Sequence, residues 1–269
     1  MAAPSASSNK AKIARRVIEV LDYFDENHRE ATVMDIVRRY DRPQSSTSEL
    51  LCSMVELGLL YKDPFTRSYS LSPRAALLGQ AGQPDLIRDG RLVRLLDRLV
   101  AQTGLSVALF GMVGLNAQIV SWRPGPRSSS SVKRNLYSGL QEPLSDSAAG
   151  WLLLSTVAQP RCDGLIRRLN AEASEDRKFS FSDMTARIQS CREERNVRGL
   201  VGYGTPAEVL ARLLPGQLDD RPLAAGFVYG SEEKVNVDGL MQCLNEAMRQ
   251  CLEDAGASAA EVERLPNAA

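Results

Sequence analysis

The chain has 269 residues, of which 43% are hydrophobic and 25% charged, and its formal net charge is zero. These are ordinary values for a globular protein, and the length allows two domains. No apolar run approaches the length of about 18 residues that a membrane helix needs. The polar start lacks the apolar core of a secretory signal, so we expect a cytoplasmic protein with no membrane partner.

The chain contains a single histidine, His28, which restricts the enzyme chemistry it could carry. Histidine is the commonest general base and metal ligand, and His28 follows a predicted helix in a polar stretch. The paired carboxylates Glu193 and Glu194 lie on a predicted polar helix face. No cysteine lies at a zinc-ribbon or CxxC spacing, so the five cysteines are expected as free thiols. We therefore expect no catalytic residue, no metal and no cofactor.

The N-terminal part of the chain begins with the periodicity of two helices. Apolar residues recur at helical spacing over 10–26, which predicts an amphipathic helix. A second helix is expected to begin at Thr32, a good N-cap residue that has Asp35 three positions on. It should end at 41–43, because Pro43 cannot continue a helix and restricts the residue before it.

A third helix and a hairpin are predicted to follow. Gly58 is expected to end the helix, as glycine commonly does. The expected buried face of this helix is Leu50, Leu51, Met54 and Leu57. Strands are expected over 59–62 and 68–72, with a proline-containing turn between them. The order helix, helix, short turn, helix, hairpin is that of a winged helix-turn-helix.

The first turn of the third helix consists of short hydrogen-bonding side chains that no core requires. A recognition helix places its N-terminal residues against base edges, where Gln can pair with adenine and Ser or Thr can bond bases or phosphates. We therefore expect this turn to read DNA, unless the serines only cap the helix or the unit contacts protein instead. The residues of the turn are Gln44, Ser45, Ser46, Thr47 and Ser48.

Basic residues cluster around the predicted helix-turn-helix although the net charge of the chain is zero. DNA binding needs a local basic face and not a basic average. The expected phosphate contacts are Arg15, Arg16, Arg38, Arg42, Lys62 and Arg67. The expected partner is therefore double-stranded DNA.

Residues 12–79 resemble the DNA-binding domain of the IclR family of regulators. The matching residues include Pro43, Ser45, Leu50, Leu51, Met54, Gly58, Leu60, Tyr69 and Leu71. MarR-like regulators share parts of this pattern. Many IclR members have an arginine in the recognition helix, whereas this chain has Glu49, which would be repelled by phosphate but could accept from a cytosine amino group.

The remainder of the chain mixes helices and strands without regular βαβ alternation, which predicts an α+β fold. A helix is expected over 86–101, a hairpin over 107–122, a surface loop over 123–131, and a last helix over 237–253. Between them we expect three helices, over 145–156, 159–172 and 182–196, and strands around 200, 210–214 and 223–229. The expected divisions are a disordered lead-in over 1–9, a winged helix-turn-helix domain over 10–82, a linker helix over 83–101, an effector domain over 102–254 and a flexible tail over 255–269.

This second half resembles the GAF-like effector domain of the same family, an antiparallel sheet with helices. The segment SGLQEPLSDSAAGWLLLS carries the likeness, with Ser145 where the family has a histidine and Trp151 where it has a lysine. The resemblance implies a ligand pocket lined by Ala148, Ala149, Leu213, Phe227 and Tyr229. The two rings would suit a small aromatic or apolar acid, unless they are simply part of the core.

The resemblance implies a sequence-specific transcription regulator of bacterial type that binds an inverted-repeat operator as a dimer or a dimer of dimers. Three hypotheses remain open. The effector half could respond to a small organic molecule, or it could have lost its ligand and only oligomerise. An enzyme fused to a winged helix is the third, and the single histidine and the lack of a nucleophile or phosphate-binding motif weigh against it.

Overall fold

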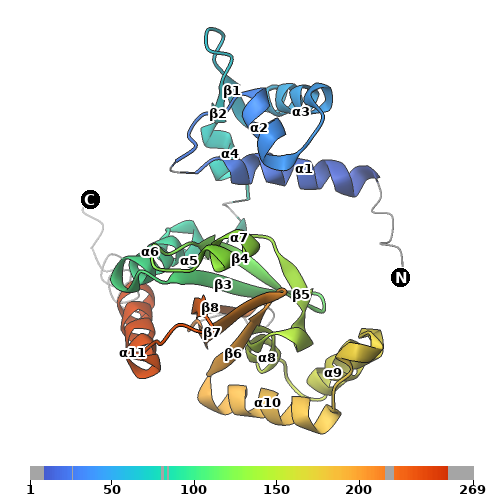
Figure 1. Cartoon of the computed structure of the whole chain (residues 1–269), viewed down its shortest axis with the longest axis vertical. Coiled ribbons are helices and arrows are strands. Elements are labelled where there is room, and N and C mark those ends of the chain that lie inside the picture. Colours follow the sequence, from blue (N-terminus) through green and yellow to red (C-terminus); the bar gives the residue numbers. More distant parts are fainter. Residues whose placement is uncertain (1–8, 26, 80–81, 84, 216–220, 254–269) are drawn as a thin grey trace, which may run out of the picture. The chain divides into compact units, whose positions relative to one another are not determined.

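The computed structural model describes residues 9–25, 27–79, 82–83, 85–215 and 221–253, and the chain divides into two compact units, Met1–Pro84 and Asp85–Ala269 (Figure 1). No helix in these ranges is long and apolar enough to cross a membrane. No group of three or more His, Cys, Asp or Glu side chains in the same ranges could hold a metal ion. Most of the expected lead-in and the whole expected tail lie outside the described residues.

The N-terminal unit contains the three expected helices and the expected hairpin, followed by a short fourth helix. The elements are α1 (Asn9–Tyr23), α2 (Val33–Tyr40), α3 (Gln44–Glu56), β1 (Leu60–Lys62), β2 (Tyr69–Leu71) and α4 (Pro73–Leu77). The two strands pair antiparallel, with Leu60 opposite Leu71. Helix α1 ends at Tyr23, three positions before the expected end, and α4 was not expected.

Local interactions explain where α2 and α3 begin and end. Thr32 and Asp35 form the capping box expected from their spacing, because the Thr32 hydroxyl accepts from the Asp35 amide while the Asp35 carboxylate accepts from the Thr32 amide. Asp41 adopts a left-handed conformation with φ of 49°, which ends α2. Gly58, with φ of +72°, follows α3 in the same way.

The buried face of α3 differs from the expected one at one end. Leu51 and Met54 are buried as expected, but Leu57 lies beyond the helix and is 63% exposed. Thr47 is the third buried residue of α3, because it lies one turn before Leu51 and two turns before Met54 on the same face. The core of the unit is Val20, Ala31, Ile36, Leu51, Met54, Leu59, Leu60 and Tyr69.

The second unit is built on a six-stranded sheet in which all neighbouring strands are antiparallel. The strand order is β5-β4-β3-β8-β7-β6. The strands are β3 (Ser106–Val113), β4 (Asn116–Arg123), β5 (Gln141–Pro143), β6 (Asn196–Gly202), β7 (Thr205–Leu213) and β8 (Leu223–Gly230). The expected hairpin is β3–β4, and the expected α+β architecture is confirmed.

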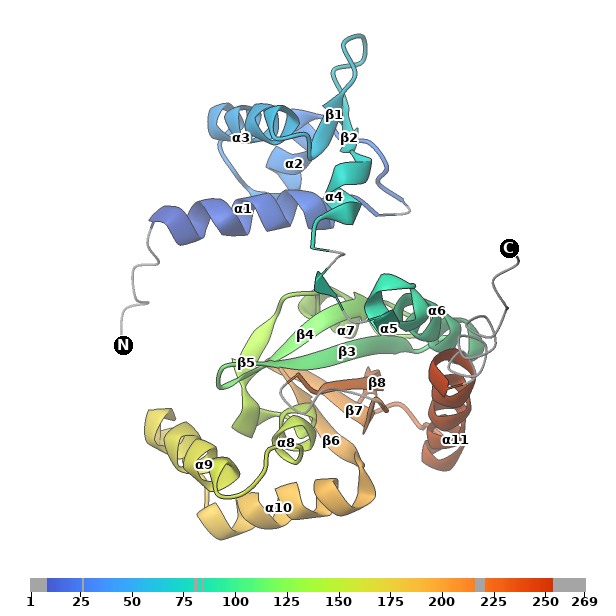
Figure 2. The same cartoon turned by 180° about the vertical axis from the view of Figure 1, so that it is seen from behind.

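Helices cover both faces of this sheet (Figures 1 and 2). One face carries α6 (Arg91–Thr103) and α11 (Val237–Met248), which pack on each other and on β3, β4 and β7. The other face carries α8 (Ala148–Leu154), against which α10 (Phe181–Glu194) packs, with α9 (Arg161–Glu172) beside α10. Each face has its own buried apolar cluster. Short helices α5 (Asp85–Arg88) and α7 (Ser130–Asn135) complete the unit.

Two expectations about this half were wrong in detail. The helix expected over 86–101 is two helices, α5 and α6, because Gly90 between them has φ of +75°. The buried leucines of α6 pack in the same cluster as β3, β8 and α11, so α6 is part of the second unit. The expected surface loop 123–131 is partly buried, since the Ser128 hydroxyl accepts from the Ser106 amide at 2.7 Å.

The last helix continues as a π-helical turn over Arg249–Glu253.

Candidate functional site

The N-terminus of α3 has no side-chain cap. Its N-cap residue is Pro43, which makes no side-chain hydrogen bond to the amides of the first turn. The hydroxyls of Ser46 and Thr47 instead donate back to the Pro43 carbonyl, at 3.3 and 2.9 Å. The interpretation that the serines serve to cap the helix is therefore not realised. The first-turn amides carry the positive end of the helix dipole and favour an anion.

The side chains expected to read DNA do not all face outward. Gln44 and Ser45 are exposed, and Ser46 and Ser48 are half-buried. Thr47 is only 1% exposed, and its hydroxyl is engaged inside the unit. The expectation that Thr47 reads a base is therefore wrong for this conformation, because its position on α3 is one turn before Leu51 and faces the core.

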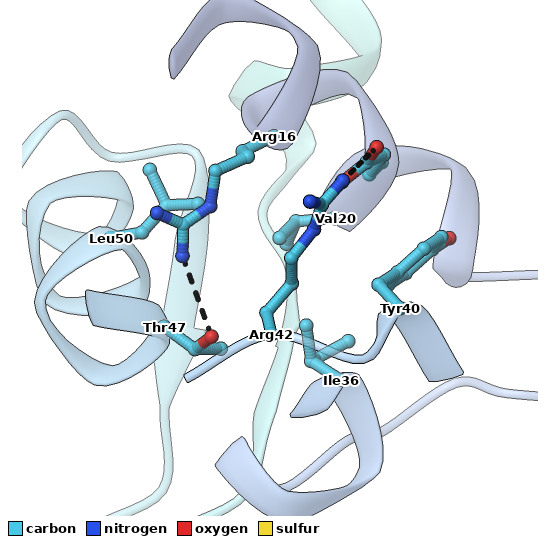
Figure 3. Close-up of a pocket in the computed structure, with 8 residues that line it drawn as sticks. Arg16, Val20, Ile36, Tyr40, Arg42, Thr47 and Leu50 are labelled. Carbon is cyan, nitrogen blue, oxygen red and sulfur yellow. Dashed lines mark hydrogen bonds and ion pairs between the residues drawn. The ribbon is translucent and has the colours of Figure 1, made fainter. Parts of the chain in front are cut away.

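Two of the expected phosphate-binding arginines bond within the unit (Figure 3). The Arg16 guanidinium, on α1, donates to the hydroxyls of Ser46 at 3.2 Å and Thr47 at 3.5 Å. Arg42, in the turn between α2 and α3, donates to both carboxylate oxygens of Glu19 at 2.9 and 3.1 Å. Its Nε is buried without a hydrogen-bond partner among the described residues. These contacts tie α1 to the turn and to the start of α3.

A small pocket of about 190 Å³, including the solvent at its mouth, lies between these side chains. Arg16, Arg42 and Thr47 line it together with apolar residues of α1, α2 and α3 (Figure 3). The pocket therefore marks the junction that positions α3 against the other two helices.

The remaining expected basic residues are exposed. Arg15 lies on α1, Arg38 in the last turn of α2, and Lys62 and Arg67 at the two sides of the hairpin tip. Within the described part of the chain, Arg15 and Arg67 form no ion pair. The Lys62 ammonium lies 5.5 Å from the centre of the Tyr69 ring. These four side chains can reach an external anion without first breaking a strong internal contact.

The structure adds two residues that the sequence reasoning did not assign to the site, Cys52 and Glu19. Cys52 is exposed on α3, where it shares one face with Ser45, Ser48 and the exposed Glu49 at helical spacing. That spacing alone could have identified Cys52. Glu19 is the ion-pair partner of Arg42, and a contact between residues 23 positions apart in the chain has no local sequence signal.

The expected effector pocket is contradicted, because its residues lie on opposite faces of the sheet. Ala148, Ala149 and Leu213 belong to the cluster on the α8 side. Phe227 and Tyr229 belong to the cluster on the α6 and α11 side, where they are buried in the core. Successive residues of a strand point to opposite faces, and the register pairs Phe227 with Val107 of the same cluster. The two rings are core residues, as the alternative interpretation held.

The α8 side of the sheet contains two buried polar atoms without hydrogen-bond partners among the described residues, Trp122 Nε1 and Glu142 Oε1. The other carboxylate oxygen of Glu142 accepts from the Tyr203 amide at 2.5 Å. Burial raises the pKa of Glu142 to about 7. A buried donor or acceptor without a partner costs free energy, so these atoms mark where a bound polar group would be stabilised.

Comparison with known proteins agrees with this description. Residues 14–64 match the IclR helix-turn-helix domain. No curated protein sequence matches the chain. The fold is similar to that of an IclR homolog from Microbacterium hydrocarbonoxydans complexed with 4-hydroxybenzoate, at 17% identity over 91% of this chain and 99% of that chain, with a TM-score of 0.58.

Two further solved structures share the fold. The IclR protein of Thermotoga maritima is 13% identical over 89% of this chain and 97% of that chain, with a TM-score of 0.56. The effector domain of a transcriptional regulator IclR from Acinetobacter sp. ADP1 is 22% identical, and the match covers 62% of this chain and 97% of that domain, with a TM-score of 0.55. The resemblance expected from the sequence is thus confirmed for the helix-turn-helix and for the fold of both units.

Proposed function

From an IclR-type helix-turn-helix at residues 14–64, we propose that the chain is a transcription regulator that reads operator DNA with the first turn of α3. The observation that carries the proposal is the uncapped start of α3, with Gln44 and Ser45 exposed beside free backbone amides. Such side chains bond base edges, and the amides attract a phosphate.

The basic residues divide into two roles in this proposal. Arg15, Arg38, Lys62 and Arg67 are exposed and contact phosphates on either side of the recognition helix. Arg16 bonds Ser46 and Thr47 and acts by holding the start of α3 in place. Phosphate contacts set the affinity and the position of the protein, whereas base contacts set the sequence.

The operator is proposed to be an inverted repeat bound by a dimer or a dimer of dimers. Two-fold symmetric proteins bind half-sites related by the same symmetry. Selection from a random-sequence library by the full-length chain tests this, because the selected sequences should contain two inverted half-sites. Binding to the selected duplex should weaken steeply with salt. A library that returns no shared sequence, or binding that ignores salt, would contradict the proposal.

The second unit is proposed to bind a small organic acid on the α8 side of the sheet. Two observations support it: the Microbacterium structure with this fold is a complex with 4-hydroxybenzoate, and the buried Trp122 Nε1 offers a donor on that side. The side chains that pack on that side of the sheet are mainly apolar, and small-molecule sites are mostly lined by apolar side chains. A ligand must favour one arrangement of the regulator to change its DNA affinity.

Calorimetry with 4-hydroxybenzoate and benzoate, with and without the selected duplex, tests the effector proposal. Thermodynamic linkage requires two equal effects: DNA must change the protein's affinity for the acid by the same factor by which the acid changes the protein's affinity for DNA. Trp122→Phe should weaken binding of the acid, because it removes the Nε1 donor while keeping an aromatic ring at this position. If neither acid binds, or if DNA leaves their affinity unchanged, the second unit serves oligomerisation without this effector.

A further inference from the structure

The tip of the β1–β2 hairpin is a short, closed loop. The Asp63 amide donates to the Ser68 carbonyl at 2.9 Å, and the Arg67 amide donates to the Asp63 carbonyl at 3.0 Å. Arg67 has φ of +58°, which turns the chain back into β2. In Figures 1 and 2 this hairpin extends away from α1, α2 and α3 of its own unit. The loop therefore projects from the unit as a defined structure.

Side chains fix the loop further. The Asp63 carboxylate accepts from the amides of Phe65 at 2.7 Å and Thr66 at 3.0 Å, and these bonds hold the pKa of Asp63 below its usual value. The hydroxyls of Thr66 and Ser68 lie 2.8 Å apart, and Ser68 donates to Glu30 at 2.9 Å. The backbone at the tip is thus held at both sides of Phe65.

This fixed loop holds Phe65 out in solvent. Its side chain is 93% exposed, the highest value for a large hydrophobic residue in the described ranges. A phenylalanine left in water forgoes the free energy that its burial would contribute. Pro64 beside it is also exposed, so the tip of the hairpin presents an apolar point to solvent.

The surroundings of the tip indicate what covers it. Lys62 and Arg67 are exposed on either side of the loop, while the exposed Asp63 carboxylate accepts from the loop's own amides, so two cations flank the apolar point. The hairpin follows α3 directly in the same compact unit. When α3 lies in a major groove, the neighbouring groove on the duplex is a minor groove, whose walls are lined with phosphates. An apolar tip with flanking cations is complementary to that groove.

We propose that Phe65 enters the minor groove beside each half-site and partly unstacks one base step, so that the operator is kinked when the protein binds. The inference rests on the DNA-binding mode proposed above. Apolar side chains that act as such wedges kink duplexes by about 20–90°. Pyrimidine–purine steps unstack most easily, so a TA or CA step is expected where Phe65 enters.

The test uses the full-length protein and the inverted-repeat duplex that it selects from a random-sequence library, with 2-aminopurine placed at the adenines flanking each half-site. Binding of the unaltered chain should raise 2-aminopurine fluorescence at one step per half-site, and circular-permutation mobility should show a bend. Phe65→Ala should remove both signals and weaken binding about tenfold. Phe65→Leu should keep much of both, because leucine also acts as a wedge.

Two further measurements separate a wedge from other roles. Phe65→Ala removes no charge, so the slope of log affinity against log salt should not change. Tyr61→Ala is the matched control, because Tyr61 is an aromatic residue of the same hairpin that is 59% exposed and lies away from the tip. It should leave the bend and the fluorescence unchanged.

The outcomes are distinguishable. If the unaltered chain selects no duplex, the DNA-binding mode itself fails. If it binds a selected duplex but Phe65→Ala binds and bends that duplex equally well, the wedge is overturned and the DNA-binding mode stands. A change of oligomeric state in Phe65→Ala, with unchanged DNA bending, would assign Phe65 to a protein contact and also overturn the proposal.

Discussion

Replacing Thr47 by valine separates a structural role of the first turn of α3 from a reading role. The sequence places Thr47 among residues that could contact bases, but it is 1% exposed and lies on the same buried face of α3 as Leu51 and Met54. Valine has the same branched shape and similar helix propensity, so the substitution removes the hydroxyl and little else.

The expected cost follows from the bonds that the hydroxyl makes. It donates to the Pro43 carbonyl at 2.9 Å and is a weak acceptor for Arg16 at 3.5 Å. In the variant the Pro43 carbonyl still accepts from the backbone amide of residue 47 at 3.1 Å, and the Arg16 guanidinium still donates to the Ser46 hydroxyl. No partner is left without a hydrogen bond, so the loss is that of one neutral hydrogen bond, about 1 kcal/mol.

The assay must report on the N-terminal unit. Both tryptophans, Trp122 and Trp151, lie in the second unit, so their fluorescence does not serve. Hydrogen exchange of the α3 amides does, and about 1 kcal/mol corresponds to exchange about fivefold faster. Ser53→Ala is the matched control, because Ser53 makes the same type of bond, to the Glu49 carbonyl at 3.0 Å, from an exposed position. It should be nearly neutral.

Thr47→Val should also select the same DNA sequence as the unaltered chain. If it instead leaves the exchange of α3 unchanged and alters the preferred base at one position, then Thr47 turns outward on DNA and the structural assignment is wrong.

Two further predictions concern charge. Arg67→Ala should weaken binding to all DNA sequences alike and lower the slope of log affinity against log salt concentration by about one. Arg168→Ala, which removes the same charge from the second unit, should change neither quantity. Equal slopes for the unaltered chain and both variants would refute a phosphate contact at Arg67. Burial raises the pKa of Glu142 from 4.5 to about 7, so the folded chain holds its proton longer and the free energy of unfolding should fall as pH rises through this window. Glu142→Gln should remove about 2 kcal/mol of that fall, after allowance for the partial exposure of the carboxyl group. Unfolding in urea, followed by the fluorescence of the two tryptophans at several pH values, measures this. An unchanged pH dependence in the variant would count against the burial of the charge.

The sequence predicts the N-terminal unit well because each of its signals is local. The capping box at Thr32 and Asp35, the break at Pro43 and the glycine after α3 all act within a few residues. Which way Thr47 faces is less local, because the whole first turn of α3 is polar and one of its residues must still cover the core. The long-range pair of Arg42 and Glu19 has no local signal either.

The effector half shows the opposite situation. Strand β8 reads as an unbroken apolar run, and both of its faces are buried, so no alternation marks which side Phe227 and Tyr229 occupy. A shift of one position moves a side chain to the other face, and only the register with β3 and β7 decides it. The sequence also does not decide whether the expected long helix breaks at Gly90, because an isolated glycine is tolerated within a helix.

The central claim, that the start of α3 reads bases, is tested most directly by comparing the sequences selected by the unaltered chain and by Gln44→Ala. Gln44 is exposed at the first position of α3. The variant should lose discrimination at one base pair in each half-site, by about 1–3 kcal/mol, and keep it elsewhere. Selection of the same sequence with the same discrimination at every position would contradict the claim.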